Sequence, residues 1–194
     1  MTFRTLRNSA IFILIVITLG AAAANKAVSP LSSARKKIAH LEQNAKLRRP
    51  DPAPTTLTEA EINAYLASDE IVMPKGVQSV RLVGESGTIT GNAHVDFDQV
   101  RAGIHSSNPL LSVFSGVHDV EVVTHAYGKG GQGYVHVDSV SLDGIEIPNM
   151  VLELFVEKYL TPRYPQIGMD SRFALPDRID SAVVGQHQVV LTQK

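Results

Sequence analysis

The sequence predicts an α+β fold in which a curved antiparallel β-sheet wraps around a long apolar helix, preceded by a signal peptide and a basic helical stem. Apolar and polar residues alternate through much of residues 77–147, a period typical of strands with one buried face. Residues 150–160 have the length of a helix and carry apolar side chains on most sides. Such a helix needs cover on most sides, and a curved sheet is the simplest partner that supplies it.

The composition excludes several classes of site. The chain has 194 residues, of which 44% are hydrophobic and 19% charged, as in ordinary globular proteins. It has no cysteine, which excludes disulfides, thiol nucleophiles and cysteine-ligated metal centres. Residues 51–194 contain eighteen acidic and nine basic residues, so this part of the chain would repel the phosphates of nucleic acid. We therefore expect no nucleic-acid partner, and no pattern in the sequence points to a cofactor.

Residues 1–24 have the pattern of a secretory signal peptide. Arg4 and Arg7 precede an apolar run at residues 11–17, and small residues follow at 20–24. The apolar stretch is shorter than the roughly 20 residues that a membrane-spanning helix needs. This length favours cleavage of the leader over an uncleaved inner-membrane anchor, and we expect a periplasmic or secreted protein.

Residues 25–55 are expected to form a basic stem and a proline-rich linker. Apolar residues recur there at helical spacing in a narrow stripe of four positions, Ala34, Ile38, Leu41 and Ala45. A stripe this narrow is typical of a solvated spacer helix. In the alternative interpretation, the cations of residues 26–49 attract an anionic membrane surface, each contributing on the order of 1 kcal/mol. Prolines 50, 52 and 54 stiffen the chain, and we place the domain boundary there.

Residues 56–194 are expected to form one α+β domain. Thr58 and Glu61 have the spacing of a capping box, so a helix begins there and ends before Asp69. A short strand is predicted at Glu70–Met73. The alternating strands that follow are interrupted at residues 97–114, which we interpret as a helical or loop insertion.

Turn and breaker residues organise the second half of this domain. Asp143 and Gly144 favour a tight hairpin between two short strands. Pro162 ends the apolar helix of residues 150–160. Two further strands are predicted at residues 180–184 and 188–192.

Two patterns in the sequence, one rich in glycine and one polar, have the residue types of chemical sites. Residues 128–133 match the dinucleotide-binding spacing of glycines, but a strand follows them where a phosphate cradle needs a helix, so a hairpin tip is predicted. Alternation places a polar set on the sheet: His94, Asp96, Asp98, His136 and Asp138. We interpret this set as a solvent face with His–Asp pairs, and we predict no catalytic or metal site. A metal-dependent enzyme that uses His94, Asp96 and His136 is an alternative.

Three segments carry a family resemblance. They are Leu57-Thr58-Glu59-Ala60-Glu61-Ile62-Asn63, the segment Asp143-Gly144-Ile145-Glu146-Ile147-Pro148 before the apolar helix, and Leu175-Pro176 before the last two strands. In this order the chain resembles LmeA-like periplasmic phospholipid-binding proteins of the tubular lipid-binding (TULIP-like) superfamily. The resemblance spans residues 57–191 and implies a curved sheet that wraps a long helix around a lipid-sized groove. It assigns a role to no individual residue.

The sequence therefore predicts an exported, non-enzymatic protein that binds a phospholipid or another long apolar ligand in a groove between helix and sheet. The candidate ligand-binding residues are Val95, Phe97, Val151, Phe155 and Tyr159. Leu110, Leu111 and Phe114 are candidates for a membrane-touching lip, with a capping minicore as the alternative for this cluster. The alternative function is a structural or interaction module of the cell envelope with a fully packed core.

Overall fold

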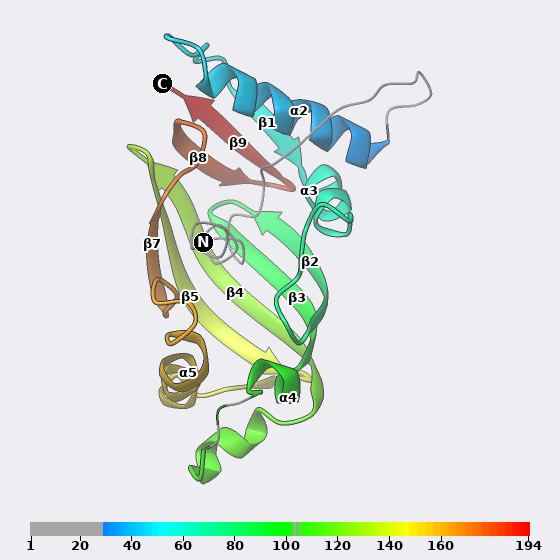
Figure 1. Ribbon diagram of the computed structural model, residues 1–194, viewed down its shortest axis with the longest axis vertical. Coiled ribbons are helices and arrows are strands. Elements are labelled where there is room, and N and C mark those ends of the chain that lie inside the picture. The colour runs from blue at the N-terminus through cyan, green and yellow to red at the C-terminus, as the bar shows by residue number, and fades with distance from the viewer. Residues whose placement is uncertain (1–28, 103, 105) are drawn as a thin grey trace.

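The computed structural model describes residues 29–102, 104 and 106–194, so the predicted leader lies outside the described residues. One antiparallel sheet of nine strands dominates this part of the chain, and short helices lie against it (Figure 1). Among the described residues, no helix is long and apolar enough to cross a membrane. The predicted α+β class with a large antiparallel sheet is confirmed.

The strands are β1 (Thr55–Thr58), β2 (Val77–Glu85), β3 (Thr88–Asp96), β4 (Val117–Lys129), β5 (Gln132–Leu142), β6 (Ile145–Glu146), β7 (Asp170–Ala174), β8 (Ile179–Gly185) and β9 (Gln188–Gln193). Their order along the main path of the sheet is β1-β9-β8-β4-β3-β2. Off this path, β5 pairs with β4 and also with β6 and β7. The helices are α2 (Pro30–Ala45), α3 (Glu59–Leu66), α4 (Phe97–Val100) and α5 (Asn149–Phe155). A 3₁₀ helix, η1 (Pro109–Val113), and a π-helical turn, η2 (Val156–Leu160), complete the elements.

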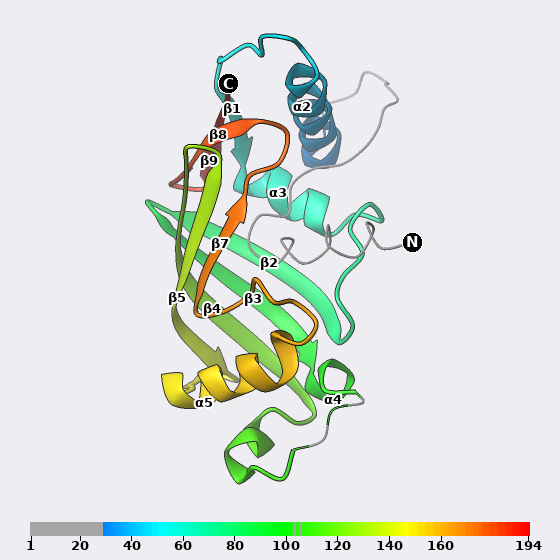
Figure 2. The ribbon, with the colours of Figure 1, turned by 60° about the vertical axis from the view of Figure 1, so that its left-hand side comes forward.

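The prediction of a long helix wrapped by a strongly curved sheet is wrong. The apolar segment forms the seven-residue helix α5 and then the π-helical turn η2, and it lies across one end of a sheet that is not strongly curled (Figure 2). The backbone amide of Thr161 donates to the carbonyl of Val156 at 2.8 Å, a bond to the fifth residue back that widens the last turn. Pro162 follows and prevents further extension of the helix.

The predicted strand at Glu70–Met73 is also wrong. These residues form turns and irregular backbone after α3. The amide of Ile71 bonds back to the carbonyl of Ser68 at 3.2 Å, and the amide of Val77 bonds to the carbonyl of Pro74 at 3.0 Å. The amide of Ile71 is therefore bonded within a local turn and not to a neighbouring strand.

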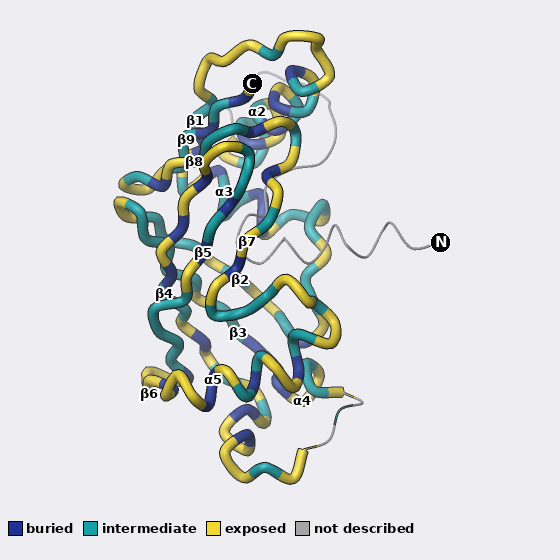
Figure 3. The backbone as a smooth tube through the Cα atoms, turned by 90° about the vertical axis from the view of Figure 1, so that its left-hand side faces the viewer, coloured by how far each residue is buried: buried dark blue, intermediate teal, exposed yellow. Residues whose placement is uncertain are grey.

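The basic stem packs against the domain, so its interpretation as a solvated spacer is wrong. Ala34, Ile38 and Leu41 of α2 are 0%, 1% and 1% exposed. Ala34 and Ile38 form a small core with Tyr65 of α3, while Leu41 joins a core that includes Leu57 of β1. In Figure 3, α2 alternates between buried and exposed colours, as expected for a helix with one covered face.

A bulge in β5 keeps its apolar residues on one face of the sheet. Val123 pairs with Ser139 and the next residue, Thr124, pairs with Val137, which leaves Asp138 as an extra residue. Without this insertion, Val137 and Val140 would point to opposite faces because strand side chains alternate. With it, both residues face the side of the sheet on which α5 lies.

The remaining predicted elements agree with the structure. The capping box is present, with the Thr58 hydroxyl and the Glu61 carboxylate bonded to each other's backbone amides. The insertion at residues 97–114 contains α4 and η1. Asp143 and Gly144 form the predicted hairpin turn with φ of 50° and 80°, and the strands at 180–184 and 188–192 correspond to β8 and β9.

Candidate functional site

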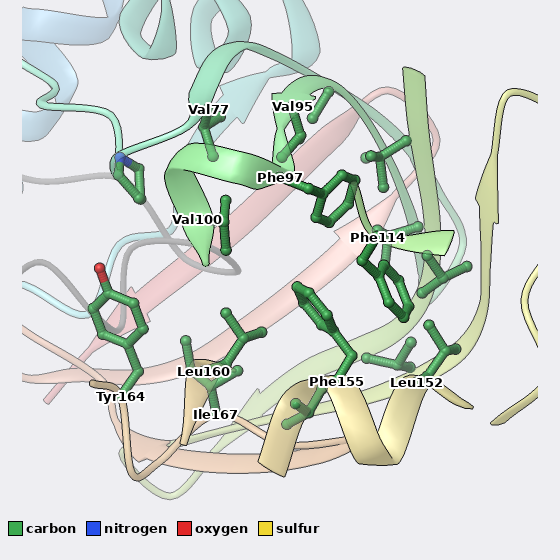
Figure 4. A pocket seen from close by; sticks show the side chains of 18 of the residues that line it. Val77, Val95, Phe97, Val100, Phe114, Leu152, Phe155, Leu160, Tyr164 and Ile167 are labelled. Carbon is green, nitrogen blue, oxygen red and sulfur yellow. The ribbon is translucent and has the colours of Figure 1, made fainter. Parts of the chain in front are cut away.

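An apolar cavity of about 390 Å³ lies between the inner face of the sheet and the helical elements at its end (Figure 4). Alternate residues of neighbouring strands form its floor, including Val80 and Leu82 of β2, Val120 and Val122 of β4, and Val137 and Val140 of β5. Protein interiors contain few voids larger than a water molecule. This volume is therefore space that the side chains of the core leave unfilled.

Two small residues of β3 give the cavity its depth. Gly91 and Ala93 face the cavity at positions where the neighbouring strands carry valine or leucine. A Cβ atom at Gly91 would lie 3.4 Å from Leu82, an ordinary van der Waals contact, so the backbone does not require glycine there for space. The small side chains at these two positions leave the floor hollow.

An aromatic cluster closes one end of the cavity. The ring of Phe155 lies 4.1 Å from the ring of Phe114 and 5.5 Å from the ring of Phe97, measured between centroids. These three residues come from α5, the segment after η1, and α4. Edge-to-face and tilted contacts of this kind hold the helical elements together over the sheet.

The π-helical turn η2 determines which side chains reach the cavity. Val156 and Leu160 line it, whereas Tyr159 is fully buried in the adjoining core. The wider turn rotates the last residues of the segment relative to an α-helix. Both apolar ends of η2 consequently face the unfilled space.

The polar lining of the cavity lies mainly at the end away from the aromatic cluster. Figure 4 places Tyr164 at this end, opposite Leu152 and Phe114. Lys75 and Arg163 also line the cavity and are exposed, so the cavity reaches the molecular surface here. The only other polar side chain of the described lining is Thr124, whose hydroxyl donates to the carbonyl of Ile89 at 3.0 Å.

Arg163 connects two segments at this opening. Its guanidinium donates to the backbone carbonyls of Val100 and Ala102, the latter at 2.7 Å. Val100 ends α4, and a Cβ atom added to Gly76, the residue after Lys75, would lie only 2.7 Å from the Val100 side chain. The residue after Lys75 and the guanidinium of Arg163 therefore both lie beside Val100.

The predicted ligand-binding residues divide into two groups. Val95, Phe97 and Phe155 line the cavity. Val151 and Tyr159 are buried in the same hydrophobic core but do not line the cavity. All five residues belong to the hydrophobic core around the cavity, and three of them reach the unfilled space.

The three predicted lip residues have different environments. Leu111 and Phe114 are 4% and 1% exposed and belong to the core next to the cavity, and Phe114 also lines it. Leu110 is 45% exposed. This arrangement corresponds to the capping minicore that was the alternative for this cluster, with Leu110 alone of the three at the surface.

The predicted polar set does not converge on one point. His94 pairs with Asp119 at 2.7 Å, His136 with Asp170 at 2.7 Å, and Asp138 with His125 at 2.6 Å. Asp96 caps α4 through the amides of Asp98 and Gln99, and the hydrogen bond from the Gln99 side chain lowers the pKa of Asp96. Among the described residues, no group of three or more histidine or acidic residues is placed to hold a metal ion. The set forms cross-strand pairs and a helix cap.

His118, at the start of β4, has a hydrogen-bond partner at each of its two ring nitrogens. Its Nδ1 lies 2.6 Å from Oδ2 of Asp143, and its Nε2 lies 2.8 Å from the carbonyl oxygen of Ser115. Both partners are acceptors, so the doubly protonated imidazolium can donate to each of them. The hydrogen bond to Asp143, followed by that to Ser115, raises the pKa of His118, and the same bond lowers the pKa of Asp143.

Sequence reasoning missed the strand residues of the floor and the two cations at the opening. Val80, Val120 and Val122 lie in the alternating stretch of residues 77–147, and this alternation is the same whether the residues fill a core or line a cavity. Lys75 and Arg163 are isolated cations next to prolines, and no spacing in the sequence connects them.

Comparisons with protein-family models, with curated proteins and with solved structures find no match to this chain. Fold and site define the class: an α+β protein whose antiparallel sheet and short helices enclose an apolar cavity with a cationic opening.

Proposed function

We propose that the protein is an exported, non-enzymatic binder of a lipid or another long apolar molecule, which it holds in the cavity between the sheet and α5. The observation that carries the proposal is the cavity of about 390 Å³, which is lined almost entirely by aliphatic and aromatic side chains. Ligand pockets in proteins span about 300–1,000 Å³ and are mostly apolar with a few polar groups. The size and chemistry of this cavity fit that range.

Burial of apolar surface would drive binding. Transfer of an alkyl chain from water to such a cavity gains roughly 25 cal/mol per Å² before the cost of ordering the ligand. Within the described lining, the floor presents no side-chain carboxylate or amide that an alkyl chain would have to desolvate. The resemblance to phospholipid-binding proteins and the leader-like residues 1–24 are consistent with such a ligand in the cell envelope.

A cavity of this size also argues against the alternative of an interaction module with a fully packed core. In such a module the valines of β2, β4 and β5 would meet the side chains of α5 and η2 without leaving space. The same residues would then contribute only to stability.

The test uses the full chain, expressed with its own leader and purified without detergent. We expect native mass spectrometry and lipid extraction to reveal a bound amphiphile, and the emptied protein to take up a neutral alkyl-pyrene probe. A protein that carries no lipid and takes up no probe overturns the proposal and favours the interaction module.

A matched pair of variants locates the site. Ala93→Leu introduces a larger side chain into the cavity, whereas Asn92→Leu introduces the same side chain at the exposed neighbouring position of β3. We expect Ala93→Leu to weaken probe binding by about tenfold or more, as filling a pocket by a few methylene groups does. Asn92→Leu should bind the probe like the unmodified protein, and equal binding by both variants would place the ligand elsewhere.

A further inference from the structure

The charge at the cavity opening has a sign opposite to that of the surrounding domain. Residues 51–194 contain eighteen acidic residues and nine basic ones. In the lining formed by the described residues there is no acidic side chain, whereas two basic residues, Lys75 and Arg163, belong to it. The opening is therefore a cationic site in an otherwise acidic domain.

Neither cation is neutralised by the described part of the chain. The ion pairs among the described residues include neither Lys75 nor Arg163, and the two hydrogen bonds of Arg163 go to neutral backbone carbonyls. An arginine has five N–H donors, so most of its donors stay available. An ammonium and a guanidinium without carboxylate partners attract an anion of a ligand.

The position of these cations matches the polarity of the cavity. Figure 4 shows Tyr164 at the end of the cavity away from Phe97, Phe114 and Phe155. Arg163 precedes Tyr164 in the chain and Lys75 follows the lining residue Pro74, and both cations are exposed. An apolar tail pointing toward the closed end would bring the head group of the same molecule to the opening. Tyr164 lines this end too and adds a hydroxyl that can donate to a head-group oxygen.

We propose that Lys75 and Arg163 form a head-group site that selects amphiphiles with an anionic head, a carboxylate or a phosphate, over neutral and cationic amphiphiles of the same chain length. This inference rests on the proposed function, because the head group is held only if the tail occupies the cavity. It adds the class of ligand, which the apolar lining alone leaves open.

The experiment measures competition against the neutral alkyl-pyrene probe by four ligands with the same chain: dodecyl phosphate, dodecanoate, dodecanol and dodecyltrimethylammonium. A hydrogen bond to a charged group stabilises a complex enough to change affinity by about tenfold or more. We expect the two anions to bind at least about tenfold more tightly than dodecanol, and the cation to bind most weakly. Added salt should reduce the difference because the site is at the surface.

Three variants assign the preference to the two cations. Lys75→Gln removes one charge from the opening and should lower the ratio of the affinity for the anions to the affinity for dodecanol. Arg163→Lys keeps the positive charge but loses the paired hydrogen bonds to the carbonyls of Val100 and Ala102. This variant therefore separates the effect of the charge on anion binding from the effect of these two hydrogen bonds. Lys158→Gln makes the same charge change on η2 outside the cavity lining and should leave the preference unchanged.

Vesicles distinguish the two sources of anionic heads. Uptake from phosphatidylglycerol vesicles in excess of uptake from phosphatidylcholine vesicles, read by native mass spectrometry, identifies a phospholipid ligand. Binding of dodecanoate without uptake from either vesicle identifies a free fatty acid. If the anions and dodecanol bind equally, the head-group site is overturned while the proposed function stands; if none of the four ligands displaces the probe and the probe itself does not bind, both fall.

Discussion

The side chain of Asn63 in α3 makes two hydrogen bonds to the backbone of Leu82 in β2. Its Nδ2 donates to the Leu82 carbonyl and its Oδ1 accepts from the Leu82 amide, both at 2.7 Å. The strand β2 is at the edge of the sheet, so these backbone groups have no neighbouring strand. The asparagine amide takes the place of one residue of that missing strand. Covered edges of this kind resist pairing with other chains.

Replacing Asn63 should therefore destabilise the domain and expose the edge. We expect Asn63→Ala to lower the free energy of unfolding by about 1–3 kcal/mol, the cost of leaving donors and acceptors unpaired. Urea denaturation measures this change, and light scattering reports association through the edge. Asn92→Ala removes an exposed asparagine from β3 and should change stability by less than about 0.5 kcal/mol. Equal stability of the two variants would show that the bonds to Leu82 do not contribute.

The packed stem leads to a second prediction. Ile38 of α2 is 1% exposed and contacts the core of Tyr65. Truncation of a fully buried isoleucine costs about 2–5 kcal/mol, so we expect Ile38→Ala to lower the free energy of unfolding by an amount in this range. Lys36→Ala, on the exposed side of the same helix, is the control for helix propensity. A loss for Ile38→Ala that is no greater than the control would mean that α2 is solvated, as the sequence first suggested.

The stem also shows why local patterns predict elements better than contacts. The spacing of Ala34, Ile38 and Leu41 identified a helix because the period of 3.6 is a property of the segment itself. Its partners, Tyr65 and Leu191, lie far along the chain, and nothing in the stripe specifies them. A narrow apolar stripe is therefore compatible with both a solvated helix and a docked one.

The strands of the cavity floor were predictable because alternation is a property of each segment itself. The cavity was not predictable from this alternation. Alternation located β3, β4 and β5, and it selected Val95 as an inward residue. Val137 and Val140 are three residues apart, a spacing that breaks the strand period of two. The bulge at Asp138 places both side chains on the same face of the sheet. Whether inward valines fill or line a space depends on residues opposite them, here the small Gly91 and Ala93 and the π-helical turn η2.

The glycine-rich hairpin of residues 128–133 supplies a third prediction. Gly130 and Gly131 form the turn with positive φ, as the sequence suggested, but Gly128 and Gly133 are buried within β4 and β5. A Cβ at Gly128 would lie 2.8 Å from both the Cβ and the backbone nitrogen of Ala182. The backbone of β8 cannot move away without disturbing its pairing with β4 and β9.

We therefore expect Gly128→Ala to lower the free energy of unfolding by about 1–3 kcal/mol, the usual cost of overpacking. Thermal or urea unfolding measures it. Gly130→Asn is the control, because nothing lies within 4 Å of a Cβ at that position and asparagine tolerates the positive φ of a two-residue turn. A Gly128→Ala protein as stable as this control would show that the approach of β8 is looser than in the structure.

The pair of His118 and Asp143 gives a pH-dependent prediction next to the cavity, since the His118 ring lies 6.0 Å from the ring of Phe97. The raised pKa of His118 contributes stability that is complete below its ordinary value of 6.5 and is lost as the pH rises through the raised pKa. The lowered pKa of Asp143 contributes stability that is present above its ordinary value of 3.8 and is lost as the pH falls through the lowered pKa. Both contributions are complete between these two ordinary values.

The backbone amide of Asp119 donates to Oδ1 of Asp143 at 2.9 Å. The variant Asp143→Asn keeps an oxygen that can accept this bond but removes the charge beside His118. We expect the midpoint of the His118 ring titration, followed by NMR, to lie above 6.5 in the unmodified protein and to fall in this variant. The stability difference between the two proteins should be largest between about pH 4 and 6 and should shrink on both sides of that window. Asp170→Asn removes a carboxylate beside His136 instead and should leave the His118 midpoint unchanged. An unchanged midpoint in Asp143→Asn would show that the carboxylate does not hold the proton on His118.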